Sequence, residues 1–352
     1  MVAASAFRAR SVGVIVSQYA KPRALVDTGW LAEHQHDPGV VVVDIHLDSA
    51  PYEAGHIPSA VFWNAVGTLV KADYGTNFDP THVQSFLGSA GISNDSTVVV
   101  TSEHPGMPAW GYWYLKTIGH DSVRVLDGGN RKWTAEHRPV STEVHTVAAA
   151  SYTAAPLDLS KRAQLEEVMA AVNGGRDVLL DVRTPEEYRG DLFMLAPPTG
   201  VERSGHIPGA AHVYYEDALN EDGTFLPVEE LASLYSEAGI SFDTKVITYC
   251  AVGMRAGHTW FVLSELLGYP EVANYDLSWN EWGRRPDTLI ESGGPGAPAP
   301  SAGTTSAAGP GTPSTGTPPK SSPPSSAAPA SEPSADNAVG PANVVRRTFP
   351  IG

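Results

Sequence analysis

KVITYCAVGMRAGHTWFVLSELLG, residues 245–268, contains the pattern that decides the fold. Its first part, VITY, is an apolar and largely β-branched run with the length of a buried strand. Its last part places Trp260, Leu263 and Leu267 on one face of a helix. The six-residue loop CAVGMR joins the two parts. A buried strand that runs directly into an amphipathic helix is typical of α/β proteins with a parallel sheet.

The same pattern occurs in the first half of the chain, where TVVVTS (97–102) precedes the helical stretch AWGYWYLKTIG (109–119). The repeat extends to GHIP at 55–58 and 205–208 and to AGIS at 90–93 and 238–241. Each half has an earlier buried run, VVVVD or DVLLD, and a closing phrase, VLDGGNRKW or NYDLSWNEW. We therefore predict two similar doubly wound α/β domains, each with a parallel central sheet flanked by helices.

The composition predicts four segments. Residues 1–19 form an N-terminal extension, 20–145 the first domain, and 146–292 the second domain, in which GDLFMLAPPTGVER (190–203) is an inserted loop. The stretch from Pro139 to Ser160 connects the two domains. Residues 293–352 are rich in Pro, Gly, Ser and Ala, so we expect a disordered tail.

Charge and cysteine content exclude several classes of function. A formal net charge of -16 argues against a nucleic-acid partner. The single cysteine excludes an internal disulfide and a CxxC motif. No apolar run approaches the ~20 residues that a membrane span requires. We expect a cytoplasmic monomer, with a mitochondrial location as the alternative if the acid-free first 26 residues are a transit peptide.

Cys250, the only cysteine, is the candidate nucleophile. It lies where the buried strand ends and the helix begins, which is where open α/β sheets bind their ligands. A turn through Gly253 into a helix N-terminus directs backbone N–H groups at the sulfur, and Arg255 adds a positive charge, so the loop favours the thiolate. The corresponding residue of the first half is Ser102, and no arginine follows it. We therefore expect the first half to be catalytically inactive.

These motifs resemble those of the tandem-domain rhodaneses, or thiosulfate sulfurtransferases, over residues 20–290. The resemblance implies an inactive first domain and an active second domain, with the persulfide on Cys250. It also implies that the loop binds substrate through Ala251, Val252, Gly253, Met254 and Arg255. Thiosulfate would donate its outer sulfur, sulfite would leave, and cyanide or another thiol acceptor would take the sulfur without a metal or cofactor.

Other residues are judged by whether both halves share them. In the first half, His46 occupies the position that corresponds to Arg183, whereas the aspartates Asp44 and Asp181 occur at matching positions in both halves. The resemblance implies that Arg183 lies beside the active loop and helps to bind the anionic donor; the alternative is a surface salt bridge with Glu186 or Glu187. Asp181 is expected to support the fold, by capping the turn or by pairing with a nearby arginine. His56 and His206 occur in both halves and are expected to form hydrogen bonds within the fold.

Residues of the last helix and the closing phrase are expected to have structural roles. We expect a surface position for His258. Trp260, Trp279 and Trp282 are expected to lie in the core or at the mouth of the site.

Three alternative functions remain. Cysteine phosphatases of a related fold have five residues between cysteine and arginine, whereas this loop has four, Ala251 to Met254. 3-Mercaptopyruvate is the alternative donor, but loops of that subfamily resemble CGSGVT, with serine and threonine where this chain has Val252 and Arg255. The vertebrate thiosulfate-type loop resembles CRKGVT, and its lysine is also absent here, so the preference for thiosulfate rests on the arginines, which suit an inorganic dianion. The third alternative is a non-catalytic persulfide carrier or interaction module, whose tail recruits a partner through PPKSSPPSS (318–326).

Overall fold

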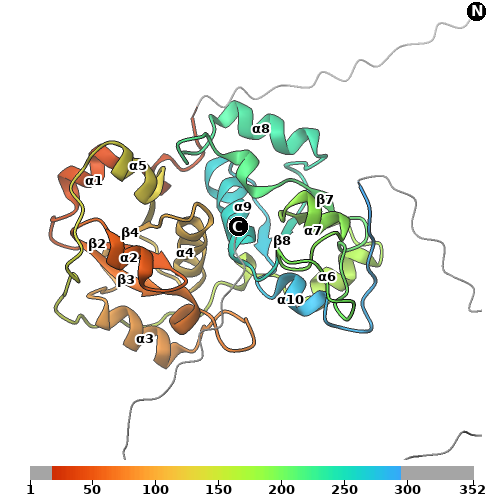
Figure 1. The fold of residues 1–352 in the computed structure, drawn as a ribbon, viewed down its shortest axis with the longest axis horizontal. Coiled ribbons are helices and arrows are strands. Elements are labelled where there is room, and N and C mark those ends of the chain that lie inside the picture. Colours follow the sequence, from red (N-terminus) through yellow and green to blue (C-terminus); the bar gives the residue numbers. More distant parts are fainter. Residues whose placement is uncertain (1–17, 295–352) are drawn as a thin grey trace, which may run out of the picture. The chain divides into compact units, whose positions relative to one another are not determined.

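The first half of the chain folds around a five-stranded parallel sheet (Figure 1). The computed structural model describes residues 18–294. The strand order is β1-β5-β4-β2-β3, and every pairing between neighbours is parallel. The strands are β1 (Leu25–Val26), β2 (Val40–His46), β3 (Ala60–Asn64), β4 (Thr97–Thr101) and β5 (Val123–Leu126).

The second half folds around a four-stranded parallel sheet of order β7-β6-β8-β9. Its strands are β6 (Val178–Asp181), β7 (Ala211–His212), β8 (Val246–Tyr249) and β9 (Val272–Asn274). In place of the edge strand β1, this half has an isolated parallel bridge between Arg162 and Asn274. The predicted pair of parallel-sheet α/β domains is confirmed.

Helices cover both faces of each sheet, as parallel strands require. Successive residues of β2 separate accordingly: Val42 packs in one apolar cluster, and Val43 packs in another. Leu179 and Leu180 of β6 separate in the same way. The helices of the first half are α1 (Thr28–His34), α2 (Ala50–Ala54), α3 (Pro80–Ser89), α4 (Gly106–Thr117) and α5 (Gly129–Ala135), and those of the second are α6 (Leu165–Val172), α7 (Pro185–Arg189), α8 (Val228–Glu237), α9 (Met254–Phe261) and α10 (Ser278–Trp282).

Shorter helical turns complete the described chain. Three are 3₁₀ turns, η1 (Pro22–Ala24), η3 (Leu159–Lys161) and η4 (Tyr215–Ala218), and two are π turns, η2 (Ala65–Leu69) and η5 (Val262–Leu266). The predicted inserted loop at 190–203 contains no helix or strand beyond one bridge between Phe193 and Ala196. The predicted disordered tail lies outside the described residues except for its first two, and so does nearly all of the N-terminal extension.

The two repeated GHIP histidines do the same structural work. His56 stacks on Tyr52 at a ring separation of 3.6 Å, and its Nδ1 hydrogen-bonds the Tyr52 carbonyl oxygen at 2.7 Å. His206 stacks on Tyr188 at 3.7 Å and bonds the Tyr188 carbonyl oxygen at 2.8 Å. The prediction that these histidines form hydrogen bonds within the fold is confirmed.

The halves meet along helices α4 and α9, which lie side by side (Figure 1). Gly257 of α9 packs so closely on Trp110 of α4 that an added Cβ would stand 2.8 Å from the indole. The buried Glu265 carboxylate also joins the two halves. It accepts a hydrogen bond from the Tyr112 hydroxyl at 2.7 Å and forms an ion pair with Lys21. One large apolar cluster consequently includes residues of both sheets.

Candidate active site

Cys250 follows β8 directly and begins the loop that leads into α9. Its side chain is buried, with 1% of the residue exposed. The Gly253 N–H donates to Cys250 Sγ at 3.1 Å, while the N–H of Cys250 itself donates to Ser278 Oγ at 3.0 Å. The sulfur therefore lies inside the loop at the carboxyl end of a parallel strand and next to a helix N-terminus, where an anion is stabilised.

Gly253 shapes this loop. It has φ +84° and precedes the first residue of α9. A Cβ at this position would lie 2.5 Å from the carbonyl oxygen of Asp276, so only glycine fits both the conformation and the space. The side-chain amide of Asn274 donates to the Gly253 carbonyl oxygen at 3.0 Å. The turn that brings an N–H to the sulfur is thus fixed by the last residue of β9 and by the segment that follows it.

The same segment holds the start of the loop. The N–H groups of Trp279 and Asn280 donate to the carbonyl oxygens of Cys250 and Ala251 at 3.0 and 2.9 Å. Ser278, which holds the Cys250 amide, has φ 50° and donates its hydroxyl to the Tyr275 carbonyl oxygen. Residues 274–280 therefore form a backbone support for the active loop.

A turn of the first half contacts this support. The Asn280 side-chain amide donates to the Asp73 carbonyl oxygen at 3.1 Å, and the Thr76 N–H donates to Asp276 Oδ2 at 3.4 Å. The Asp276 carboxylate, 1% exposed, also pairs with Arg162 Nε at 2.7 Å. The first half thus contributes to the environment of the loop although it has no thiol.

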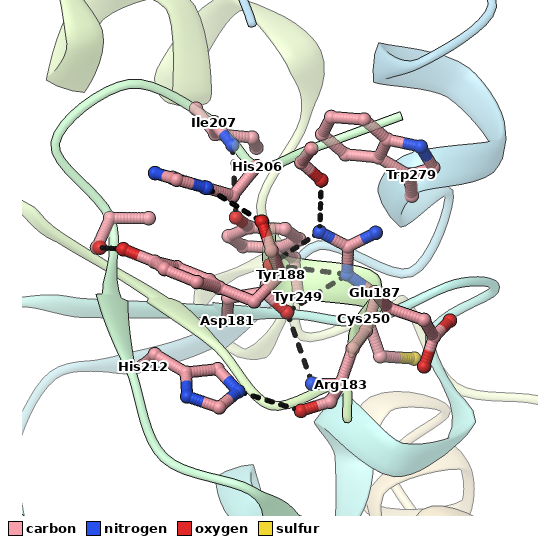
Figure 2. A network of polar contacts seen from close by, with 12 residues as sticks. Asp181, Arg183, Glu187, Tyr188, His206, Ile207, His212, Tyr249, Cys250 and Trp279 are labelled. Carbon is pink, nitrogen blue, oxygen red and sulfur yellow. Dashed lines mark hydrogen bonds and ion pairs between the residues drawn. The ribbon is translucent and has the colours of Figure 1, made fainter. Parts of the chain in front are cut away.

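Arg183 lies inside the fold, and its part in binding an anionic donor stays a prediction. Its side chain is fully buried and pairs with Asp181, with Nη2 to Oδ2 at 2.5 Å, and Nη2 also donates to the Gly205 carbonyl oxygen (Figure 2). Burial lowers the pKa of the Arg183 guanidinium, but the charge of Asp181 outweighs this effect and raises the pKa above its ordinary value. The guanidinium carbon lies 4.4 Å from the centre of the Trp279 ring. Asp181 acts as a partner of Arg183, as predicted.

Arg255 is not a free cation at the rim either. Its Nη1 and Nη2 donate to the two carboxylate oxygens of Glu187 at 2.7 and 3.0 Å. The Arg255 side chain is 12% exposed and that of Glu187 is fully buried. Burial lowers the pKa of the Arg255 guanidinium, but Glu187 raises it by more, and Cys250 contributes to the increase. Both arginines named from the sequence therefore stand in buried ion pairs, Arg183 against the rings of Tyr249 and Trp279 and Arg255 near Cys250.

The first half fills the equivalent positions with other groups. The Ser102 hydroxyl donates to the Ile45 carbonyl oxygen at 2.6 Å and is unavailable as a nucleophile. His46 pairs with Asp44 at 2.8 Å where Arg183 pairs with Asp181. Asn130 donates to both oxygens of the Asp44 carboxylate. The shared aspartates thus keep their structural role in both halves.

His258 is buried rather than exposed, so the surface position expected for it is wrong. Its ring lies between Phe225, at 5.2 Å, and Tyr215, at 5.4 Å. Neither ring nitrogen has a hydrogen-bond partner among residues 18–294. Burial lowers the pKa of His258 to about 3, so the imidazole is neutral. The three tryptophans lie in the core, as expected.

Three residues of the site were not expected there from the sequence: Asp276, Ser278 and Glu187, which was considered only as a surface partner of Arg183. Glu187 had a usable signal, because the first half has Pro51 in the position before the matching tyrosine. A carboxylate present only in the half with the cysteine meets the criterion that selected Arg183. Asp276 is shared with the first half as Asp127, and its contacts follow only from the three-dimensional arrangement.

Residues 18–294 contain no group of three or more His, Cys, Asp or Glu side chains that could hold a metal ion. No helix in that part of the chain has the length and apolar character to cross a membrane. The expected monomeric state and cytoplasmic location stay predictions.

A buried lone cysteine at the turn between a parallel strand and a helix, carried by the second of two repeated parallel-sheet domains, defines this protein as a member of the rhodanese family. The Rhodanese-like domain family matches the chain twice, at residues 27–136 and 164–285.

Named relatives cover the same region. The Sulfur carrier protein TtuD of Thermus thermophilus is 40% identical over 290 residues, which is 78% of this chain and 99% of the relative. Putative thiosulfate sulfurtransferase 1 of Mycobacterium bovis is 40% identical over 280 residues, again 78% of this chain and 99% of the relative.

A solved structure shares the fold. The anaerobic ergothioneine biosynthesis enzyme from Chlorobium limicola, determined in complex with trimethyl histidine, superposes with a TM-score of 0.67. It is 25% identical in sequence, and the match covers 79% of this chain and 72% of that one.

Proposed function

We propose that this protein is a thiosulfate sulfurtransferase that carries a sulfane sulfur as a persulfide on Cys250. The observation that carries the proposal is the position of Cys250 Sγ, which accepts the Gly253 N–H at 3.1 Å inside a loop between β8 and α9. Because Cys250 is the only thiol of the chain, nucleophilic sulfur chemistry can be assigned to no other side chain.

The reaction proceeds in two displacements. The Cys250 thiolate attacks the outer sulfur of thiosulfate, a sulfur–sulfur bond forms to Cys250, and the bond to the sulfonate sulfur breaks as its electron pair leaves with sulfite. Cyanide or a thiolate then attacks the terminal sulfur of the persulfide, and Cys250 leaves as the thiolate. The Gly253 N–H stabilises the negative charge of the loop sulfur before and after the transfer.

The choice of thiosulfate as donor rests on the relatives and on the loop. Several relatives of about 40% identity are named putative thiosulfate sulfurtransferases. Val252 and Arg255 match neither the mercaptopyruvate-type loop nor the vertebrate thiosulfate-type loop, so the support from the loop is the positive charge of Arg255. Arg255 reaches the loop with 12% of its side chain exposed, and Arg183 supports the site from the interior. Sulfite release from thiosulfate is expected to exceed pyruvate release from 3-mercaptopyruvate at equal protein concentration.

Intact-mass analysis tests the persulfide directly. After incubation with thiosulfate and removal of excess donor, we expect the wild type to gain the mass of one sulfur atom and Cys250→Ser to gain none. A wild type that takes up no sulfur from thiosulfate, 3-mercaptopyruvate or a low-molecular-weight persulfide would defeat the mechanism.

A sulfur carrier that loads once and delivers to a partner protein is the second candidate. It is supported by the relative named as a sulfur carrier. The chain also has no second cysteine that could take the sulfur, so the terminal sulfur of the persulfide must be transferred to another molecule. Repeated turnover with cyanide as acceptor supports the enzyme. Stoichiometric loading followed by transfer to a protein thiol, without turnover on cyanide, supports the carrier.

A further inference from the structure

We infer that Glu187 is a positioning residue for Cys250: it fixes the end of the active loop through Arg255 and offsets the positive charge that Arg255 brings to the thiol. This inference deepens the proposed function, on which it rests. It assigns a role in the chemistry to a carboxylate that does not touch the reacting sulfur.

The geometry fixes both partners. Glu187 lies on α7 and is fully buried, and its two oxygens accept from Nη1 and Nη2 of Arg255 at 2.7 and 3.0 Å. A bidentate pair between a carboxylate and a guanidinium allows little rotation of either group. The carboxylate is itself anchored, because Oε2 also accepts the Thr184 N–H at 3.2 Å at the start of α7. Figure 2 shows the Glu187 carboxylate directed to the same side of the network as the Cys250 sulfur.

The pair occurs only in the half with the thiol. When Tyr52 is matched to Tyr188, Glu187 corresponds to Pro51. When Ser102 is matched to Cys250, Arg255 corresponds to Met107. Both charges are therefore absent from the half whose loop has no cysteine, whereas the aspartate that supports the fold is present in both. The Arg255–Glu187 pair is therefore associated with the presence of the cysteine and is not a requirement of the shared fold.

Charge balance gives the pair its chemical effect. Asp181 offsets Arg183, and Glu187 offsets Arg255, so the four buried charges sum to zero before the thiol ionises. In a region of low dielectric, an arginine without its carboxylate would favour the thiolate strongly, and a thiolate that is too stable is a weak nucleophile. Glu187 therefore moderates the influence of Arg255 while it holds the loop in place.

The test compares Glu187→Gln with two other variants. Glu186→Gln is the matched control, because Glu186 is the neighbouring residue on α7 but pairs on the surface with Arg189. Glu187→Asp keeps the negative charge but shortens the side chain by one methylene, so the carboxylate lies farther from Arg255. The readout is the pH profile of Cys250 alkylation by iodoacetamide, measured on the full chain, together with the rate of sulfur uptake from thiosulfate.

We expect Glu187→Gln to shift the alkylation midpoint to lower pH by about half a unit, which is roughly a threefold higher rate on the acid limb. Glu186→Gln should match the wild type. Glu187→Asp should keep the wild-type midpoint and lose at least about threefold in the rate of sulfur uptake, because the loop is less well held.

A folded Glu187→Gln with the wild-type alkylation profile overturns the inference. If Glu187→Gln does not fold, the test depends on Glu187→Asp. A Glu187→Asp variant that takes up sulfur at the wild-type rate overturns the inference. Alkylation needs no sulfur donor, so a shifted profile in a protein that takes up no sulfur contradicts only the proposed function.

Discussion

Gly253 lies so close to the backbone of Asp276 that a Cβ on Gly253 would stand 2.5 Å from the Asp276 carbonyl oxygen and 2.7 Å from its Cα. Glycine is thus required at the turn for its conformation and for its lack of a side chain. The Gly253 N–H that donates to Cys250 depends on this contact, so substitution should affect chemistry and stability together.

Gly253→Ala should lower the free energy of unfolding by about 3 kcal/mol, since it combines an unfavourable φ with a backbone clash. Gly239→Ala is the control, because Gly239 has φ +79° but no atom within 4 Å of the added Cβ. It should cost about 1 kcal/mol and leave sulfur uptake unchanged. Denaturant unfolding and intact-mass analysis check both variants. Equal sulfur uptake by the two would contradict the role assigned to the turn.

Asp276→Asn should destabilise the protein by about 2 kcal/mol, because Arg162 loses the charge of a buried partner. Sulfur uptake should also slow, since Asp276 belongs to the support of the loop. The control is Asp287→Asn, which weakens the exposed pair with Arg285 and should change neither quantity measurably. Thermal unfolding together with the rate of persulfide formation measures both effects. The role of Asp276 is refuted if the two variants cannot be distinguished.

Ser102→Cys introduced into the Cys250→Ser background should not take up sulfur from thiosulfate. In the first half Pro105 precedes α4 and Pro108 lies in its first turn, and the positions that match Arg255 and Glu187 have no charge. A cysteine there would lie where the Ser102 hydroxyl bonds the Ile45 carbonyl oxygen. Intact-mass analysis after thiosulfate treatment is the measurement. A gain of one sulfur atom would mean that the fold alone, without the ion pair, activates a thiol.

The stability of the protein should fall as the pH drops below about 6.5, the unfolded-state pKa of histidine. Burial lowers the pKa of His258 to about 3 in the folded state, so between these values the unfolded chain binds a proton that the folded chain does not. This difference makes unfolding easier at lower pH. From pH 7.5 to 5.5, His258 should contribute about 1.4 kcal/mol of the loss.

His258→Phe should reduce the pH dependence by that amount, because phenylalanine fits among Phe225 and Tyr215 and does not titrate. Urea unfolding of both proteins at the two pH values gives the comparison. His104 and His206, whose pKa values burial also lowers, will keep part of the dependence in the variant. An unchanged slope would show that His258 is protonated in the folded protein.

The sequence was sufficient to predict the sheets, because apolar runs, helix periodicity and the repeat all act over short stretches. It was also sufficient to select Cys250, since no other thiol exists. The ion-pair partners of the two arginines were harder to predict. Arg183 turns toward an aspartate two residues away, while Glu187 and Arg255 are separated by 68 positions, and spacing alone does not predict such a pair. His258 was misplaced because a single helix does not reveal what covers it.

The contact between Gly257 and Trp110 indicates what the first half does for the second. The helix that begins at the loop of Cys250 rests against the half that has no cysteine, so that half cannot be removed without exposing the helix to water. The first repeat therefore supports the second through the contact between α4 and α9. We expect the loop after β4 to accept substitutions more readily than the surface of α4 that contacts α9.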